Sequence, residues 1–192
     1  MGLNYREHLA ETGMSPQAFP DLFNKYNTAL KRHNGTIAVS TLNANEFDYE
    51  SEQVVLIGRE AQNVSEADAL SYVFGYTAGN DFSARDLQLR TSQWLVTGDQ
   101  IDDPQTLRIQ TFVNDESALR QDANTSQMIF SVAQIISYTS QFITLEPGDV
   151  IFTGTPSGVI LGLPKDKQIW LKAGDRIMTR ISKLGDLCVT LA

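Results

Sequence analysis

The sequence has one cysteine, no dense basic segment and no long apolar run. Because Cys188 is the only cysteine, no disulfide can form within the chain, and nothing points to an oxidising compartment. We expect Cys188 to be a small buried side chain. No apolar segment approaches the roughly 20 residues of a membrane-spanning helix, and the N-terminus lacks the basic and apolar regions of a signal peptide. These absences predict a cytoplasmic protein that does not enter a membrane.

The charge balance argues against a nucleic-acid partner. The chain carries 15 Lys and Arg residues against 23 Asp and Glu residues, a net charge of −8. No basic run is dense enough to follow a phosphate backbone. The length of 192 residues is that of one domain with a sizeable core, and no linker or low-complexity segment interrupts it. We therefore predict a single domain over residues 1–192.

The apolar pattern predicts many strands and few helices. Strands are expected at 36–40, 49–57, 72–81, 107–114, 150–153, 176–181 and 187–191. Helices are expected at 5–11, at 65–70 with Ser65 as a cap, and at 126–142. Frequent turns between strands favour a β-rich α+β architecture over an alternating parallel one.

Three acidic residues stand out against this pattern. Glu50 and Glu52 open a segment that becomes β-branched and apolar, and Asp81 follows an aromatic-rich segment that we expect to be another strand. Side chains at i and i+2 of a strand share a face. Taken alone, the glutamate pair is more typical of the solvated face of a half-buried strand. A third carboxylate from a separate strand would complete an oxygen-only site suited to Mg²⁺ or Mn²⁺.

Four segments, which follow one another in a fixed order, favour a functional role for these carboxylates over a position on the solvated face of a strand. They are Gly2-Leu3-Asn4-Tyr5-Arg6-Glu7-His8-Leu9-Ala10-Glu11, Glu50-Ser51-Glu52, the segment from Gly75 to Asp86, and the segment from Leu145 to Gly158. Together they resemble the fumarylacetoacetate hydrolase family along nearly the whole chain, in particular its small acylpyruvate hydrolases and 2-hydroxyhepta-2,4-diene-1,7-dioate isomerases. This resemblance implies a mixed β-sandwich roll with a few short helices.

The resemblance also implies a chemistry. Glu50, Glu52 and Asp81 match the family's ligands for a divalent metal, Mg²⁺ or Mn²⁺, to which a short 2-oxo acid binds. The metal would stabilise an enolate. The preferred reaction is hydrolytic carbon–carbon cleavage of an acylpyruvate. Oxaloacetate decarboxylation and isomerisation or hydration of a 2-oxo dioate remain open, as does a non-catalytic protein that binds 2-oxo acids.

Further site residues follow from the same match. His8 and Glu11 resemble the pair that activates water, although three-residue spacing also suits a routine contact on an exposed helix. Arg85, Gln88 and Thr155 resemble substrate-binding positions, although Arg85 could equally form a surface salt bridge with Asp86. Lys25 is assigned no role, because Tyr26 replaces the proline of a recurrent Phe-x-Lys-Pro stretch in the family.

The chain also departs from the family pattern. A lysine-bearing segment expected between Trp94 and Leu95 is absent, through either a true deletion or the omission of a mobile loop, and we favour omission. A true deletion would put hydrolysis in doubt while leaving the metal ligands intact. The start at Gly2-Leu3-Asn4-Tyr5 resembles the end of a strand whose earlier residues are not present. The resemblance alone predicts a homodimer.

Overall fold

The computed structural model describes residues 1–25, 31–41, 44–86, 91–92, 96–97 and 101–192. The first of its two larger sheets has five strands. Their spatial order is β1 (Gly35–Ile37), β12 (Gly185–Leu191), β11 (Arg176–Ile181), β8 (Arg108–Val113) and β9 (Asp115–Asn124). β1 pairs with β12 in parallel, and the other pairs are antiparallel.

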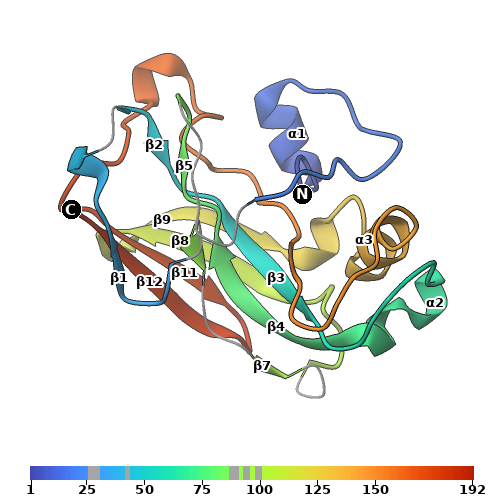
Figure 1. Cartoon of the computed structure of the whole chain (residues 1–192). Helices are drawn as coiled ribbons and strands as arrows, with labels where there is room; N and C mark the ends of the chain where they lie inside the picture. The colour runs from blue at the N-terminus through green and yellow to red at the C-terminus, as the bar shows by residue number, and fades with distance from the viewer. Residues whose placement is uncertain (26–30, 42–43, 87–90, 93–95, 98–100) are drawn as a thin grey trace.

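The second larger sheet carries the acidic segments. Its order is β10 (Val150–Phe152), β3 (Ser51–Ile57), β4 (Val73–Asn80) and β6 (Thr91–Ser92), with β7 (Val96–Thr97) also paired to β4. A small sheet joins β2 (Phe47–Asp48) to β5 (Ser83–Ala84). Figure 1 shows β3 and β4 lying against the first sheet, and β4 contacts β11 and β12 while β3 contacts β8. The β-rich α+β sandwich is confirmed.

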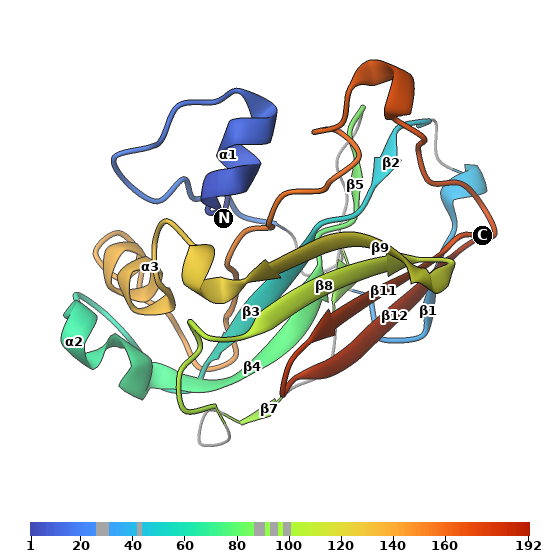
Figure 2. The same ribbon diagram turned by 180° about the vertical axis from the view of Figure 1, so that it is seen from behind.

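Helices are short in the described part of the chain. The α-helices are α1 (Arg6–Thr12), α2 (Glu66–Ala69) and α3 (Val132–Thr139), and single 3₁₀ turns occupy Val39–Thr41, Leu70–Tyr72, Thr125–Gln127 and Lys165–Lys167. Figures 1 and 2 show α2 and α3 packed together at one end of the second sheet, with α1 beside the N-terminus. The predicted cap is confirmed, since the Ser65 side chain accepts a hydrogen bond from the Asp68 N–H. Among the described residues, no helix is both long and apolar enough to cross a membrane.

The core lies between the two sheets and beneath α3. The main apolar cluster joins side chains of both sheets to this helix, and its members include Val55, Ile57, Tyr76, Ile109, Ile136, Ile181 and Leu187. A second cluster lies around β2, β5 and β12 and includes Phe47, Phe82, Ile177 and Val189. Cys188 is buried as predicted.

Several boundaries differ from the sequence predictions for local reasons. The strand expected at 36–40 ends at Ile37, and a 3₁₀ turn follows. The helix expected at 126–142 is divided, because Asn124 and Ser131 each form a capping box and start separate helical turns. β9 was not predicted. Among the described strands it pairs only with β8, and because it is polar and mostly exposed it lacks the apolar pattern on which the prediction depends.

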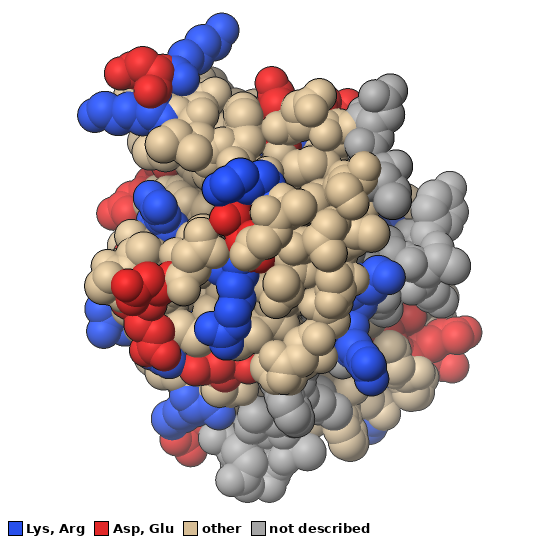
Figure 3. Space-filling model, turned by 90° about the vertical axis from the view of Figure 1, so that its left-hand side faces the viewer, with Lys and Arg blue, Asp and Glu red and all other residues tan. Residues whose placement is uncertain are grey.

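Charged side chains are dispersed on the face drawn in Figure 3. Lys and Arg residues lie there among Asp and Glu residues, in several places directly beside them. The described residues of this face therefore offer no continuous basic surface of the kind that follows a phosphate backbone.

Candidate active site

The three predicted metal ligands meet at one end of β3 and β4. One carboxylate oxygen each from Glu50, Glu52 and Asp81 lies within 4.8 Å of the others. The antiparallel register pairs Ser51 with Asn80, and the Asp81 N–H donates to the Glu50 carbonyl oxygen over 2.7 Å. Glu52 and Asp81 are only 2% exposed. The solvated-face alternative therefore does not describe these carboxylates.

Each of the three carboxylates is held by a different kind of partner. The Gly154 N–H donates to Glu52 Oε2 over 2.6 Å. Arg85 Nη2 lies 2.9 Å from Glu50 Oε1, and Lys25 Nζ lies 2.7 Å from Asp81 Oδ1. The cluster is thus oriented by one backbone donor and two cations, which fix the side chains that would have to converge on an ion.

Arg85 is held by a second carboxylate that is fully buried. Asp48 Oδ2 accepts hydrogen bonds from Arg85 Nε and Nη2 at 2.9 and 2.7 Å. The Asp48 carboxylate also accepts from the backbone N–H groups of Ile160 and Leu161. Arg85 therefore forms a buried ion pair network in place of the surface salt bridge with Asp86. Its predicted contact with substrate remains a prediction.

Burial and mutual repulsion disfavour the ionised form of the glutamates. Burial raises the pKa of Glu52 to about 8; the amino group of Met1 and the Gly154 N–H act in the opposite direction, whereas the charges of Asp81 and Glu50 raise the pKa further. Burial also raises the pKa of Glu50, although Arg85 acts in the opposite direction. Carboxylates that repel one another in a buried site are a typical setting for a bound cation, which stabilises the ionised forms together.

Metal-free protein is expected to lose stability as the pH rises from about 5 to about 8. The pKa of Glu52 is raised to about 8 from the ordinary 4.5, so in this interval the folded state holds more protons than the unfolded state. The free energy of unfolding then falls with rising pH. Saturating Mn²⁺ should raise the melting temperature by roughly 5–10 °C at about pH 8, and by less at about pH 6. Scanning calorimetry at both pH values checks this, and an equal or larger rise at the lower pH would contradict it.

The formal charge of the site fits a divalent cation. Among the described residues, the site has four carboxylates, those of Asp48, Glu50, Glu52 and Asp81, and two side-chain cations contact them, Arg85 and Lys25. With all six ionised, four negative and two positive charges leave −2. An all-oxygen ligand set with this charge suits Mg²⁺ or Mn²⁺.

The predicted His8–Glu11 pair is formed on α1. His8 Nδ1 lies 2.7 Å from Glu11 Oε1, and His8 is buried, which excludes a contact on an exposed helix face. A carboxylate at Nδ1 favours the tautomer with its proton there and leaves Nε2 as an acceptor. Glu11 Oε2 also accepts from the Gly158 N–H over 3.0 Å. Gly162 gives this carboxylate room, because a Cβ there would lie 2.5 Å from Glu11 Cδ.

Residues 153–158 connect the acidic cluster to this pair. Within this segment, the Gly154 N–H binds Glu52 and the Gly158 N–H binds Glu11. Asn4 anchors the start of α1 to the same segment, because its Nδ2 donates to the Thr153 carbonyl oxygen over 2.7 Å. Gly154 has a φ of +95°, and a Cβ there would lie 2.7 Å from the Asn4 Cβ. A larger residue at Gly154 would therefore disturb both groups.

Of the other two predicted substrate contacts, the structure describes Thr155 and does not describe Gln88. Thr155 lies in the connecting segment, where its hydroxyl donates to the Ser51 carbonyl oxygen and accepts from Gln121 Nε2, each over 2.9 Å. It thereby ties residues 153–158 to β3 between the two glutamates. Gln88 lies outside the described residues, as do Trp94 and Leu95 at the expected lysine-bearing segment.

The structure adds three residues that the sequence interpretation missed. Asp48 precedes Glu50 by two residues, and an alternating acidic pattern that includes it could have been noticed. Lys25 had no role in the sequence interpretation. The Tyr5 hydroxyl is buried without a hydrogen-bond partner among the described residues, and after burial the charge of Glu52 is the second cause that raises its pKa. An unsatisfied donor in this position is available to a ligand of the acidic cluster.

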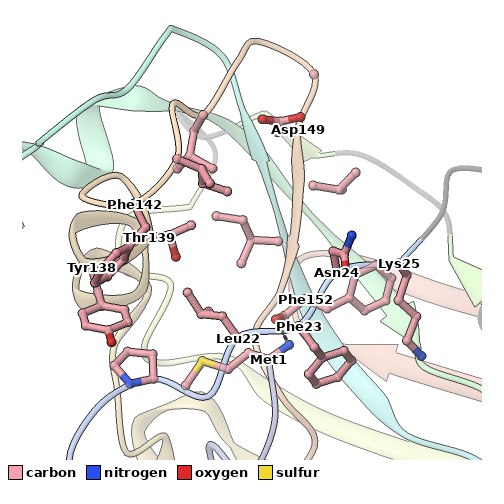
Figure 4. A pocket seen from close by; sticks show the side chains of 16 residues that line it. Met1, Leu22, Phe23, Asn24, Lys25, Tyr138, Thr139, Phe142, Asp149 and Phe152 are labelled. Atoms are coloured by element: carbon pink, nitrogen blue, oxygen red, sulfur yellow. Dashed lines mark hydrogen bonds between the residues drawn. The ribbon is translucent and has the colours of Figure 1, made fainter.

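A separate pocket of about 730 Å³ lies along the outer edge of β10. Figure 4 shows it between Tyr138 and Phe142 on one side and Phe23, Asn24 and Lys25 on the other. Its lining is largely apolar and does not include the three carboxylates. We therefore place the chemistry at the acidic cluster, with Lys25 belonging to both places.

Comparison with known proteins identifies the family. The family model described as fumarylacetoacetate (FAA) hydrolase, C-terminal, matches residues 1–192. The chain is 42% identical to the fumarylacetoacetate hydrolase domain-containing protein 2 homolog of Dictyostelium discoideum, over 97% of the chain and 68% of that protein. It is 41% identical to the caffeoylpyruvate hydrolase of Neonothopanus nambi, over 100% of the chain and 66% of that protein. The chain belongs to the fumarylacetoacetate hydrolase family of enzymes.

Solved structures agree with this assignment. Fumarylpyruvate hydrolase from Pseudomonas aeruginosa, in complex with Mn²⁺ and pyruvate, superposes with a TM-score of 0.83 at 28% identity, covering 100% of this chain and 87% of that one. The 2-hydroxyhepta-2,4-diene-1,7-dioate isomerase from Mycobacterium marinum superposes with a TM-score of 0.79 at 33% identity, covering 100% of this chain and 72% of that one.

The chain spans less than half the length of another relative. This relative, a 4-hydroxyphenylacetate degradation bifunctional isomerase/decarboxylase of Salmonella dublin, is 38% identical over 94% of the chain, which covers 46% of that relative's length.

Proposed function

We propose that this chain is a divalent-metal-dependent enzyme acting on short 2-oxo acids, and that its reaction is hydrolytic cleavage of an acylpyruvate. The observation that carries the proposal is the buried cluster of Glu50, Glu52 and Asp81, joined through residues 153–158 to the His8–Glu11 pair. The relatives named as caffeoylpyruvate and fumarylpyruvate hydrolases support this reaction, and the second was solved with Mn²⁺ and pyruvate.

Each group has a proposed role in hydrolysis. Mg²⁺ or Mn²⁺ held by the three carboxylates would supply Lewis-acid chemistry at the 2-oxo group. His8 Nε2 would accept a proton from water, and Glu11 would stabilise the charged imidazole. The water oxygen bonds to the acyl carbon, the carbon–carbon bond breaks with its electron pair on the pyruvate carbon, and that carbon takes up the proton accepted by His8, so that a carboxylic acid and pyruvate result. Arg85 and Gln88 are proposed to bind the substrate carboxylate or its oxo oxygen, and Thr155 is proposed to bind the carboxylate in exchange for its present bond to the Ser51 carbonyl oxygen.

Oxaloacetate decarboxylation and isomerisation of a 2-oxo dioate form the second candidate. The isomerase/decarboxylase relative and the mycobacterial isomerase support them. Both reactions use the metal ligands and a carboxylate-binding group, but neither consumes an attacking water. The His8–Glu11 pair therefore favours hydrolysis.

Pyruvate release from a short acylpyruvate and from oxaloacetate tests the proposal. Each substrate is assayed with Mg²⁺, with Mn²⁺ and with excess chelator. Metal-dependent release is expected, and faster release from the acylpyruvate supports hydrolysis over decarboxylation. Absence of release from both would reject these two activities, leaving dioate isomerisation or a non-catalytic protein that binds 2-oxo acids.

Two further properties complete the proposal. We infer a homodimer from the resemblance to the family, and light scattering after size-exclusion chromatography tests it. A cytoplasmic location rests on the composition of the sequence, and microscopy of a tagged full-length protein tests it.

A further inference from the structure

Lys25 joins the acidic cluster from a distant part of the sequence. Its Nζ lies 2.7 Å from Asp81 Oδ1, and the side chains are 16% and 3% exposed. The ammonium group lies 5.7 Å from the centre of the Phe23 ring. Figure 4 shows the Lys25 side chain extending away from Tyr138 and Phe142. The lysine is therefore a largely buried cation that lines one side of the apolar pocket and directs its ammonium group at a proposed metal ligand.

The two cations of the cluster are engaged differently. Arg85 contacts two carboxylates, those of Asp48 and Glu50, so the protein itself more than balances its charge. Lys25 contacts one carboxylate of the cluster, Asp81. A lysine ammonium carries three donors, and the Asp81 contact uses one of them. Within the described part of the chain, two ammonium donors are thus left for an anion that binds beside Asp81.

We propose that Lys25 tunes the charge of this centre: it weakens the binding of a divalent cation and strengthens the binding of the anionic 2-oxo acid. This inference rests on the proposed function. A fixed positive charge beside a metal ligand repels a second cation and attracts an anion through the same field. Together with a divalent cation, the six ionised side chains of the site have no formal net charge. Without Lys25 the same site would carry −1, which disfavours the binding of an anionic substrate.

The charge argument makes Lys25 a determinant of specificity. An anion with two charges interacts about twice as strongly with a fixed charge as an anion with one. Loss of Lys25 should therefore weaken the binding of a dianion more than that of a monoanion. The favoured substrates are short 2-oxo acids with more than one carboxylate.

The test compares Lys25→Met with Lys25→Arg, and the exposed Lys165→Met serves as control. Titration calorimetry measures Mn²⁺ binding to the metal-free chain, then pyruvate and oxalate binding to the Mn²⁺-loaded chain. Lys25→Met should bind Mn²⁺ about tenfold more tightly, pyruvate about tenfold more weakly, and oxalate more weakly still. Lys25→Arg and Lys165→Met should stay within about threefold of the wild type, because both keep the charge at the site.

The expected effects of Lys25→Met on Mn²⁺ binding and on anion binding have opposite signs, and this distinguishes the proposal from a structural role for Lys25. If Lys25 only supported the fold, Lys25→Met would weaken Mn²⁺ and anion binding together, and the inference would be overturned. Unchanged binding of both would overturn it too. In either case, Mn²⁺ and oxalate binding by the wild type would leave the proposed function intact. A wild type that bound no Mn²⁺ would overturn both.

Discussion

Substitution of His8 by asparagine is expected to abolish acylpyruvate hydrolysis while leaving Mn²⁺ binding within a few-fold of the wild type. A general base contributes about 10²–10⁴-fold to a rate, so kcat should fall by that factor. His8 contacts Glu11 and is not among the clustered carboxylates, so the ion's proposed ligands stay in place. Initial-rate kinetics for pyruvate release, with calorimetric titration of Mn²⁺, measure the two effects.

The other histidine of the chain provides a matched control. His33 Nδ1 accepts a hydrogen bond from the N–H of Cys188 on β12, in the sheet that does not contain β3 and β4. His33→Asn should retain hydrolysis.

The His8→Asn variant should keep oxaloacetate decarboxylation, since that reaction needs no attacking water. Cleavage of acylpyruvate at an undiminished rate in His8→Asn would refute the proposed base.

Substitution of Glu52 by glutamine is expected to remove metal binding and to stabilise the metal-free fold. Loss of a ligand carboxylate should weaken Mn²⁺ binding by more than about 100-fold, because outer-shell partners alone are worth 10–100-fold. Burial raises the pKa of Glu52 to about 8. At higher pH the wild type must hold an ionised carboxylate that the fold disfavours, whereas glutamine is neutral.

The neutral side chain also keeps the existing hydrogen bond. A glutamine Oε1 can still accept from the Gly154 N–H that now binds Glu52. The metal-free variant should therefore melt at a higher temperature than metal-free wild type at about pH 9. The exposed Glu60→Gln serves as control and should change neither property. A variant that melts lower than the wild type at this pH would contradict the sign of the Glu52 pKa shift.

Local sequence patterns predicted much of the fold. Runs of β-branched and apolar residues predicted strands at 176–181 and 49–57, and the structure has β11 at the first position and β3, beginning only at Ser51, at the second. The pattern failed where it carries little apolar signal. β9 is polar and mostly exposed, so its pairing with β8 is decided by the neighbouring strand and not by its own side chains.

The candidate site was predicted as two separate groups of residues. Helix geometry brings His8 and Glu11 together on α1, whereas Glu50 lies one residue before β3 and Glu52 within it. The structure gathers each group, and Asp81 joins the first through the antiparallel register of β3 and β4. Their roles in catalysis remain predictions that the experiments above address.

The sequence by itself determined which side chains could serve as ligands, base and donors, because those roles depend on residue type and local spacing. Only the tertiary structure decided which partners hold them. Lys25 and Asp81 are 56 positions apart, and Asp48 and Ile160 are 112 positions apart, so these contacts arise only when sheet packing brings distant segments together. The tertiary structure also determined which of these side chains are buried. Burial raises the pKa of Glu52 to about 8 and makes the neighbouring cations influential, since charges interact more strongly where water is excluded.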